Sequence, residues 1–285
     1  MKKLSTLLIA VALCCTAFAQ PDLGPITDSI RREGLALYKC EMASWYGTDI
    51  FMERFKDLRQ KAGGYFSYYK NDQATCIFYS KEEKPKVLAS FTFDSTYDVS
   101  RAQVDATERA FTTEESELYT LRKLASDDIY SDTLYKSYKN TNLNLIPLVS
   151  YGQKKVYVLT GPSIGGVVVI GNDYLITFDN DNKIVSRRRL HKNIIPIEYG
   201  KNTEGQAETG MAMHSHLPET GDFITATDIC TLMLYAKYAK WEQHIVISEK
   251  YVSIWYCDKN SLLVLTRDAW EKIYKTSEKE KKKQE

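Results

Sequence analysis

Apolar residues recur every three or four positions in several stretches of this chain, which is the spacing of one helix face. The longest such stretch covers residues 26–62 and ends at a pair of glycines. A second predicted helix covers residues 113–125, where Thr112 and Glu115 have the spacing of a capping box. A third, at residues 226–240, has a single apolar stripe, and a last helix is expected to begin near Asp268.

Other stretches are short runs rich in Val, Ile, Tyr and Phe, which is typical of β-strands. Three of them predict a meander in the first half of the chain, and the second half is richer in strands. The runs are residues 65–69, 74–80, 86–94, 143–150, 154–161, 165–179, 182–192, 194–200, 210–216, 244–248, 252–257 and 262–266. The pattern predicts an α+β fold with a mixed, mostly antiparallel sheet flanked by helices.

The first 19 residues have the pattern of a secretory signal peptide. A basic pair precedes an apolar run, and Ala17-Phe18-Ala19 supplies small residues at the cleavage site. We therefore expect export to the periplasm or the extracellular space. Cys14 and Cys15 suggest a lipoprotein as the alternative, but Leu13 is not the small residue that should precede a lipidated cysteine.

The charge balance changes little when the signal peptide is removed. Loss of Lys2 and Lys3 turns the formal net charge of +1 into about −1, which favours neither nucleic acid nor an anionic membrane surface. No later stretch has the 18 apolar residues that a membrane span needs.

Four cysteines remain after cleavage, at positions 40, 76, 230 and 257. In an exported protein they allow three disulfide pairings, and their wide spacing has no zinc-ribbon pattern. A mature chain of this length can bury a sizeable core without such bonds. Disulfides are therefore allowed by the sequence but not required.

The main candidate for chemistry is the segment MAMHSHLPETGDFITATD at residues 211–228. His214 and His216 would project from the same face of a strand, and Asp228 falls in the first turn of the next helix. Two imidazoles and a carboxylate predict a three-ligand zinc site with a water at the fourth position. Alternatively, Thr225 and Asp228 form an ordinary helix N-cap, and the histidines are exposed on an edge strand.

The remaining candidate motifs have simpler interpretations. His191 lies near Arg187, Arg188 and Arg189 on a strand that could bind an acidic partner but is more simply an exposed face, and His244 is interpreted as a capping or packing residue rather than a ligand. The glycine-rich run at residues 160–171 lacks the lysine of a phosphate loop, and Asp179 to Asn182 lack the glycine and glutamate of a calcium loop. Both are interpreted as hairpin turns.

The segment at residues 214–228 resembles the zinc motif of the JAB/JAMM (MPN-fold) metallopeptidases, in which His-x-His is followed by Ser-x-x-Asp. The resemblance covers about residues 150–265, with a linker one residue longer than the commonest spacing. It implies an MPN-like fold in the C-terminal half and Zn²⁺ held by His214, His216 and Asp228. It also implies that Thr225 replaces the serine that stabilises the oxyanion, and that the substrate is a peptide or protein.

The family's general base is a glutamate upstream of the first histidine, and this chain has no clear counterpart. Lys154 and Lys155 stand where the acid is expected, and Glu115, Glu117 and Glu198 lie outside the family's context. Two functions therefore remain. One is an exported zinc-binding hydrolase of peptide or isopeptide bonds with an unassigned base. The alternative is a non-catalytic exported binding or scaffold protein with a JAB-like fold.

With this resemblance, the chain divides into a signal peptide (1–19), an N-terminal α+β region (20–110), a JAB/JAMM-like metal-binding domain (111–275) and a charged tail (276–285). The sequence does not define an oligomeric state.

Overall fold

The structure, a computed structural model, describes residues 22–200 and 210–284, with side chains as far as residue 276. The predicted signal peptide lies outside the described residues. The charged tail continues the last helix, α4 (Arg267–Gln284). Helices and strands are mixed along the chain, and the sheets are mainly antiparallel, which confirms the predicted α+β class.

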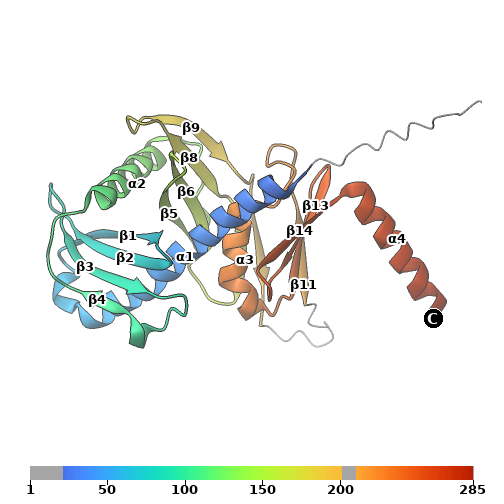
Figure 1. Cartoon of the computed structure of the whole chain (residues 1–285), viewed down its shortest axis with the longest axis horizontal. Coiled ribbons are helices and arrows are strands. Elements are labelled where there is room, and N and C mark those ends of the chain that lie inside the picture. Colours follow the sequence, from blue (N-terminus) through green and yellow to red (C-terminus); the bar gives the residue numbers. More distant parts are fainter. Residues whose placement is uncertain (1–21, 201–209, 285) are drawn as a thin grey trace, which may run out of the picture.

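Two four-stranded antiparallel sheets make up the first two thirds of the molecule (Figure 1). The N-terminal sheet has the order β1-β2-β3-β4, and the central sheet has the order β5-β6-β8-β9. Helix α2 (Thr113–Ser131) connects them. The strands are β1 (Ala62–Lys70), β2 (Gln73–Ser80), β3 (Val87–Phe93), β4 (Gln103–Asp105), β5 (Thr141–Ser150), β6 (Gln153–Pro162), β8 (Tyr174–Phe178) and β9 (Ile184–Arg189).

The C-terminal third contains a strand–helix–strand unit that carries the candidate site. β11 (Met211–Ser215) and β12 (Gln243–Ile247) pair in parallel, and α3 (Ala226–Ala239) forms the crossover between them. Parallel strands require such a crossover. β13 (Tyr251–Tyr256) and β14 (Ser261–Thr266) complete this sheet, and β7 (Val167–Gly171) pairs separately with β10 (Ile194–Glu198).

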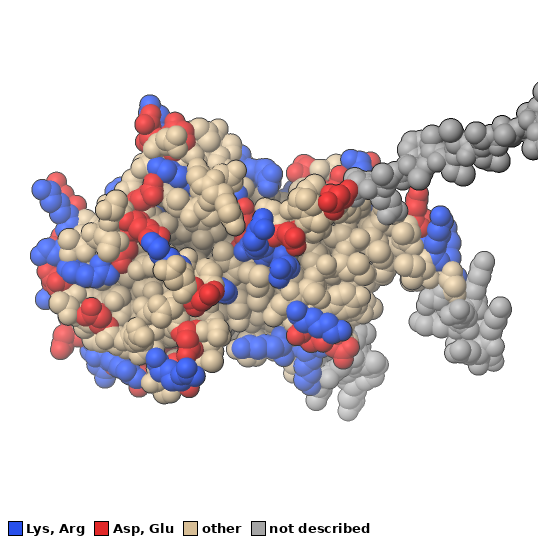
Figure 2. All heavy atoms as spheres, viewed as in Figure 1, with Lys and Arg blue, Asp and Glu red and all other residues tan. Residues whose placement is uncertain are grey.

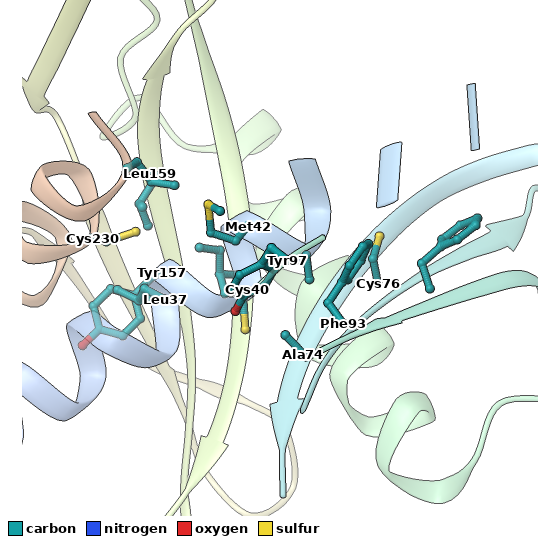
Figure 3. Packing of buried hydrophobic residues seen from close by; sticks show 14 of the residues in the cluster. Leu37, Cys40, Met42, Ala74, Cys76, Phe93, Tyr97, Tyr157, Leu159 and Cys230 are labelled. Atoms are coloured by element: carbon teal, nitrogen blue, oxygen red, sulfur yellow. The ribbon is translucent and has the colours of Figure 1, made fainter. Parts of the chain in front are cut away.

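The long helix α1 (Gly24–Arg54) joins the two halves of the molecule. In Figure 3 its residues Leu37 and Cys40 lie between Cys76 of the N-terminal sheet and Leu159 and Cys230 of the central sheet and α3. All five belong to one buried cluster, so the largest core contains residues from both sides of position 110. The predicted regions 20–110 and 111–275 therefore share a core.

Several local features predicted from the sequence are present in the structure, whereas the end of the first helix differs from the prediction. Both hydrogen bonds of the predicted capping box are present at the start of α2. The two-residue turn between β1 and β2 has φ values of 51° and 60° at Asn71 and Asp72, as a type I′ hairpin requires. The predicted helix 26–62 is too long: α1 ends at Arg54, and a short 3₁₀ turn at Lys56–Leu58 packs Leu58 against the core instead.

The surface charges, the helix composition and the state of the cysteines describe the molecule beyond its core. On the face drawn in Figure 2, acidic and basic side chains are interspersed. Among the described residues, none of the helices has the length and apolar composition needed to cross a membrane. The four cysteines at positions 40, 76, 230 and 257 are free thiols, and all but Cys257 are buried.

Candidate metal centre

All four histidines of the chain lie in one buried cluster beside the start of α3. His214 lies on β11, His216 follows that strand, and His191 follows β9. Asp228, in the first turn of α3, is 1% exposed. One ligand atom from each of His191, His214, His216 and Asp228 lies within 4.8 Å of the others, so this group could hold a metal ion.

The parallel pairing of β11 and β12 sets the direction of the two neighbouring histidines. Residue 214 is opposite Val246, and the N–H of His216 continues the pairing by donating to the carbonyl oxygen of Ile247 at 2.9 Å. Residues two apart on an extended chain point the same way. The Nε2 atoms of His214 and His216 are consequently 3.0 Å apart, and the predicted convergence is present.

The spacing of the donor atoms suits a tetrahedral ion. His191 Nε2 is 3.3 Å from Asp228 Oδ1, and His214 Nε2 is 3.7 Å from the same oxygen. Zinc bonds of about 2.0–2.1 Å in tetrahedral geometry place ligand atoms about 3.3 Å apart. Asp228 Oδ1 is also a buried oxygen without a hydrogen-bond partner among the described residues. A bound cation would satisfy it.

The outward-facing nitrogens of two imidazoles face groups that can only accept a proton. His216 Nδ1 lies 3.0 Å from the carbonyl oxygen of Phe223, so that nitrogen carries the hydrogen and donates it. His191 Nδ1 lies 3.4 Å from Asp173 Oδ2, close enough for an ion pair, although neither ring nitrogen of His191 forms a hydrogen bond within the described residues. Metal-binding histidines commonly face a carbonyl or a carboxylate in this way, which leaves the Nε2 lone pair for the metal.

The third imidazole is held by the fourth histidine. His214 Nδ1 lies 2.8 Å from Nε2 of His244, which is fully buried on β12. Burial lowers the pKa of His214 to about 3 and that of His244 to about 4, with the neighbouring imidazoles adding to the effect. Both rings are therefore neutral at ordinary pH, and a neutral imidazole is the form that binds metal. His244 supports a ligand, in agreement with its predicted packing role.

The centre also holds the charges that an ion would balance. Burial alone would raise the pKa of Asp228, but the imidazoles of His191 and His214 hold it well below its usual value. Burial opposes protonation of His191, yet Asp228 and Asp173 outweigh it and raise its pKa to about 10. Without a metal, a proton on His191 thus takes the place of the cation.

Thr225 has a different position from the one that the family resemblance implies. It is the N-cap of α3: its hydroxyl accepts from the N–H of Asp228 at 3.0 Å and donates to Asp228 Oδ2 at 2.8 Å. The predicted N-cap is therefore present, but the two histidines are buried rather than exposed, and the same segment contributes to a group that could hold a metal ion. Because the Thr225 hydroxyl donates its hydrogen to Asp228, that hydrogen does not point to a substrate in this structure. The role of Thr225 in stabilising an oxyanion stays a prediction.

None of the three candidate glutamates belongs to the cluster as described. Glu115 and Glu117 lie on α2: Glu115 accepts hydrogen bonds from the two terminal guanidinium nitrogens of Arg109, and Glu117 forms an ion pair with Lys154 at 2.7 Å. Glu198 ends β10. The further carboxylate beside the centre is that of Asp173, which also accepts the N–H of Thr160 at 2.8 Å.

The sequence did not identify His191 as a site residue. It was expected on an exposed strand face, but it is 7% exposed and supplies a fourth donor. With all four donors on one ion, no position would be left for the water of the three-ligand prediction, which itself stays a prediction. The sequence feature that could have suggested a role for His191 is the small number of histidines: the chain has only four, and two of them lie in the motif at residues 214–216.

Comparisons with known proteins leave the chain without an assigned family. No protein-family model matches it, and neither a curated protein nor a solved structure gave a match. The JAB/JAMM resemblance consequently stays a prediction based on the motif at residues 214–228. The chain therefore contains a buried group of three histidines and one aspartate that could hold a metal ion, beside a parallel strand–helix–strand unit.

Proposed function

We propose that the protein is a non-catalytic exported binding or scaffold protein in which one zinc ion stabilises the fold. The observation that carries this proposal is the convergence of four protein donors, His191, His214, His216 and Asp228. Structural zinc sites have four protein ligands, whereas catalytic sites keep one position open for water. Export rests on the predicted signal peptide.

The elements that supply the donors explain what the ion would do. His191 follows the last strand of the central sheet, whereas His214, His216 and Asp228 belong to the β11–α3 unit. An ion bound by all four ties the C-terminal unit to the central sheet. Because the unfolded chain lacks such a site, the free energy of metal binding becomes free energy of folding.

The test is the metal content of the folded protein after removal of the signal peptide. We expect about one zinc per chain by elemental analysis, and loss of that zinc in Asp228→Asn, whose amide keeps the shape of the cap. Asp127→Asn is the control, because this aspartate is exposed on α2 and outside the cluster. Wild-type protein that contains no metal and takes up no added zinc would refute the proposal.

A second candidate is the exported JAB/JAMM-like hydrolase of peptide or isopeptide bonds. It is supported by a cavity of about 220 Å³ beside the cluster, lined by Thr225, Phe223, Leu190 and Glu33 among others. In this function His214, His216 and Asp228 bind zinc, and His191 is not a ligand. An acid such as Glu33 would have to act as base, although Lys155 and Tyr157 already bind it.

His191→Ala separates the two functions. A closed four-ligand centre predicts that this variant loses most of its zinc affinity and that the wild type cleaves no peptide. The hydrolase predicts that the variant keeps one zinc per chain and that His214→Ala abolishes cleavage of peptide and isopeptide substrates. Circular dichroism of each variant shows whether it is folded.

A further inference from the structure

A second cavity, of about 570 Å³, lies away from the histidines, between α1, α3 and β5. Its volume is within the range of small-molecule sites. One wall is a single face of α1, with Glu41, Trp45 and Asp49 at successive spacings of four residues. The opposite wall includes Tyr235 and Tyr238. Tyr235 is seven residues beyond Asp228, which is roughly 10 Å along the axis of α3.

The polar lining of this cavity is acidic. Glu41 and Asp49 are the charged residues that line it, and no lysine, arginine or histidine of the described part of the chain does. Asn144 of β5 donates to Glu41 Oε2 at 3.2 Å, and no basic side chain in the described ranges forms an ion pair with Glu41. Glu41 is half-buried, and a carboxylate that has lost much of its hydration normally has a counter-charge, because that loss is costly.

The groups around Glu41 do not supply that charge. Burial raises the pKa of Glu41 to about 7, and the hydrogen bond from Asn144 only partly opposes this. The nearby groups with shifted pKa values are phenols and thiols, and burial raises the pKa of each, which keeps them uncharged: Tyr65, Tyr235, Cys40, Cys76 and Cys230. Arg122 lies across a smaller cavity that shares Glu41, but it donates to the hydroxyl of Tyr79.

The aromatic lining suits a cation with an apolar body. The rings of Trp45 and Tyr235 are 6.3 Å apart and tilted by 42°, and Trp45 is 43% exposed. Lys237 already places its ammonium group 4.7 Å from the ring centre of Tyr238. Aromatic faces attract ammonium and guanidinium groups, and an apolar body gains by covering exposed ring surface.

We propose that this cavity binds an organic cation, with its ammonium or guanidinium group on Glu41 and its apolar body against Trp45 and Tyr235. The ligand is a free amine or the side chain of a lysine or arginine in a peptide, since both present the same chemistry. The site is independent of the metal centre, so it stands whichever function the cluster has.

Calorimetric titration of the mature chain tests the proposal at pH 8. The probes are phenethylamine and its neutral analogue 2-phenylethanol, with Nα-acetyl-lysinamide as the peptide-type probe. We expect phenethylamine to bind at least tenfold more tightly than 2-phenylethanol. Tighter binding of the lysine probe than of phenethylamine would identify a peptide side chain as the source of the cation.

Two variants locate the site. Glu41→Gln should remove the tenfold preference for the amine, whereas Glu53→Gln, an exposed change of the same charge on the same helix, should keep it. Trp45→Ala should weaken the binding of both phenyl compounds, and because Trp45 is partly exposed to solvent we expect this variant to fold. Equal affinity for the charged and neutral probes, no binding of either cation, or an unchanged preference in Glu41→Gln would overturn the proposal.

Discussion

Glu115 illustrates how this protein stabilises a buried charge at the residue scale. Its side chain is 1% exposed, and Arg109 binds both carboxylate oxygens, at 2.6 and 2.8 Å. The same carboxylate accepts the N–H of Thr112 in the capping box. Burial opposes ionisation, but Arg109 and these hydrogen bonds outweigh it and lower the pKa of Glu115. The pair should therefore behave as a unit.

Arg109→Ala should reduce the free energy of unfolding by about 3 kcal/mol, because it leaves a buried carboxylate without its counter-charge. The measurement is urea denaturation at neutral pH. Lys86→Ala is the matched control: its partner Glu108 is 51% exposed, and exposed pairs contribute less than about 1 kcal/mol. Similar losses in the two variants would contradict this account.

Glu41, unlike Glu115, has no basic partner among the residues that the structure describes, and its pKa is raised rather than lowered. This determines how the stability of the folded state depends on pH. Its pKa rises from 4.5 to about 7 on folding, so the folded state prefers the protonated form. The associated stability is fully present below pH 4.5 and is lost as the pH rises through about 7. The free energy of unfolding falls by about 3 kcal/mol between pH 4.5 and pH 8.5 as a result of this shift.

Glu41→Gln should therefore gain stability relative to the wild type between pH 4.5 and pH 8.5, by up to about 3 kcal/mol. Denaturant unfolding at the two pH values measures the difference. Glu53→Gln, on the same helix but exposed, should show no comparable pH dependence. A constant difference between Glu41→Gln and the wild type over this range would show that the carboxylate is not destabilised by burial.

At the scale of elements, the contact between α1 and α3 depends on a glycine. A Cβ atom at Gly34 would lie 2.7 Å from the Cβ of Ile229 and 3.1 Å from the carbonyl oxygen of Ala226. Helices approach this closely only where one of them lacks a side chain. The contact brings α1 against the first turns of α3, next to Asp228.

Gly34→Ala should destabilise the protein by about 1–3 kcal/mol through overpacking. Alanine normally favours a helix over glycine by about 1 kcal/mol, so a loss has the opposite sign to the intrinsic preference. Thermal or urea unfolding measures it. Ser29→Ala, at an exposed position of the same helix, should change stability by less than about 0.5 kcal/mol. Stabilisation by Gly34→Ala would mean that the two helices can move apart at no cost.

At the scale of the whole molecule, the candidate metal centre connects parts of the chain that are far apart in sequence. Under the proposed function, removal of zinc with a chelator should lower the melting temperature by about 10 °C, given roughly 4 kcal/mol of binding energy and 2–4 °C per kcal/mol. Differential scanning calorimetry with and without the chelator measures this. Asp228→Asn should show no further decrease on chelation, and an equal decrease in that variant would place the effect elsewhere.

The reactivity of the four free thiols measures whether the shared core is folded, because three of them are buried in it. Cys40, Cys76 and Cys230 are buried in the shared core, and burial also raises the pKa of Cys257 to about 11. With Ellman's reagent, only Cys257 should react in the folded mature chain, and slowly, because the thiolate is the reactive form. All four should react in denaturant. A disulfide found under non-reducing conditions, or four fast thiols in the native state, would contradict this arrangement.

Local patterns in the sequence determined the α+β class, the helix caps at Thr112 and Thr225, the meander of β1, β2 and β3, and the convergence of His214 with His216. Each of these depends on residues close together in the chain. Hydrogen-bond spacing and strand alternation operate at that range, so the sequence alone could predict them.

Only the tertiary structure decided which distant residues meet. His191 and Asp173 join the centre because the residues after β9 and the turn between β7 and β8 lie beside the start of α3, and Glu41 faces Tyr235 because α1 packs on α3. The end of α1 at Arg54 was decided in the same way, by the packing of Leu58. No local periodicity encodes such contacts, because they depend on how helices and sheets pack after they have formed.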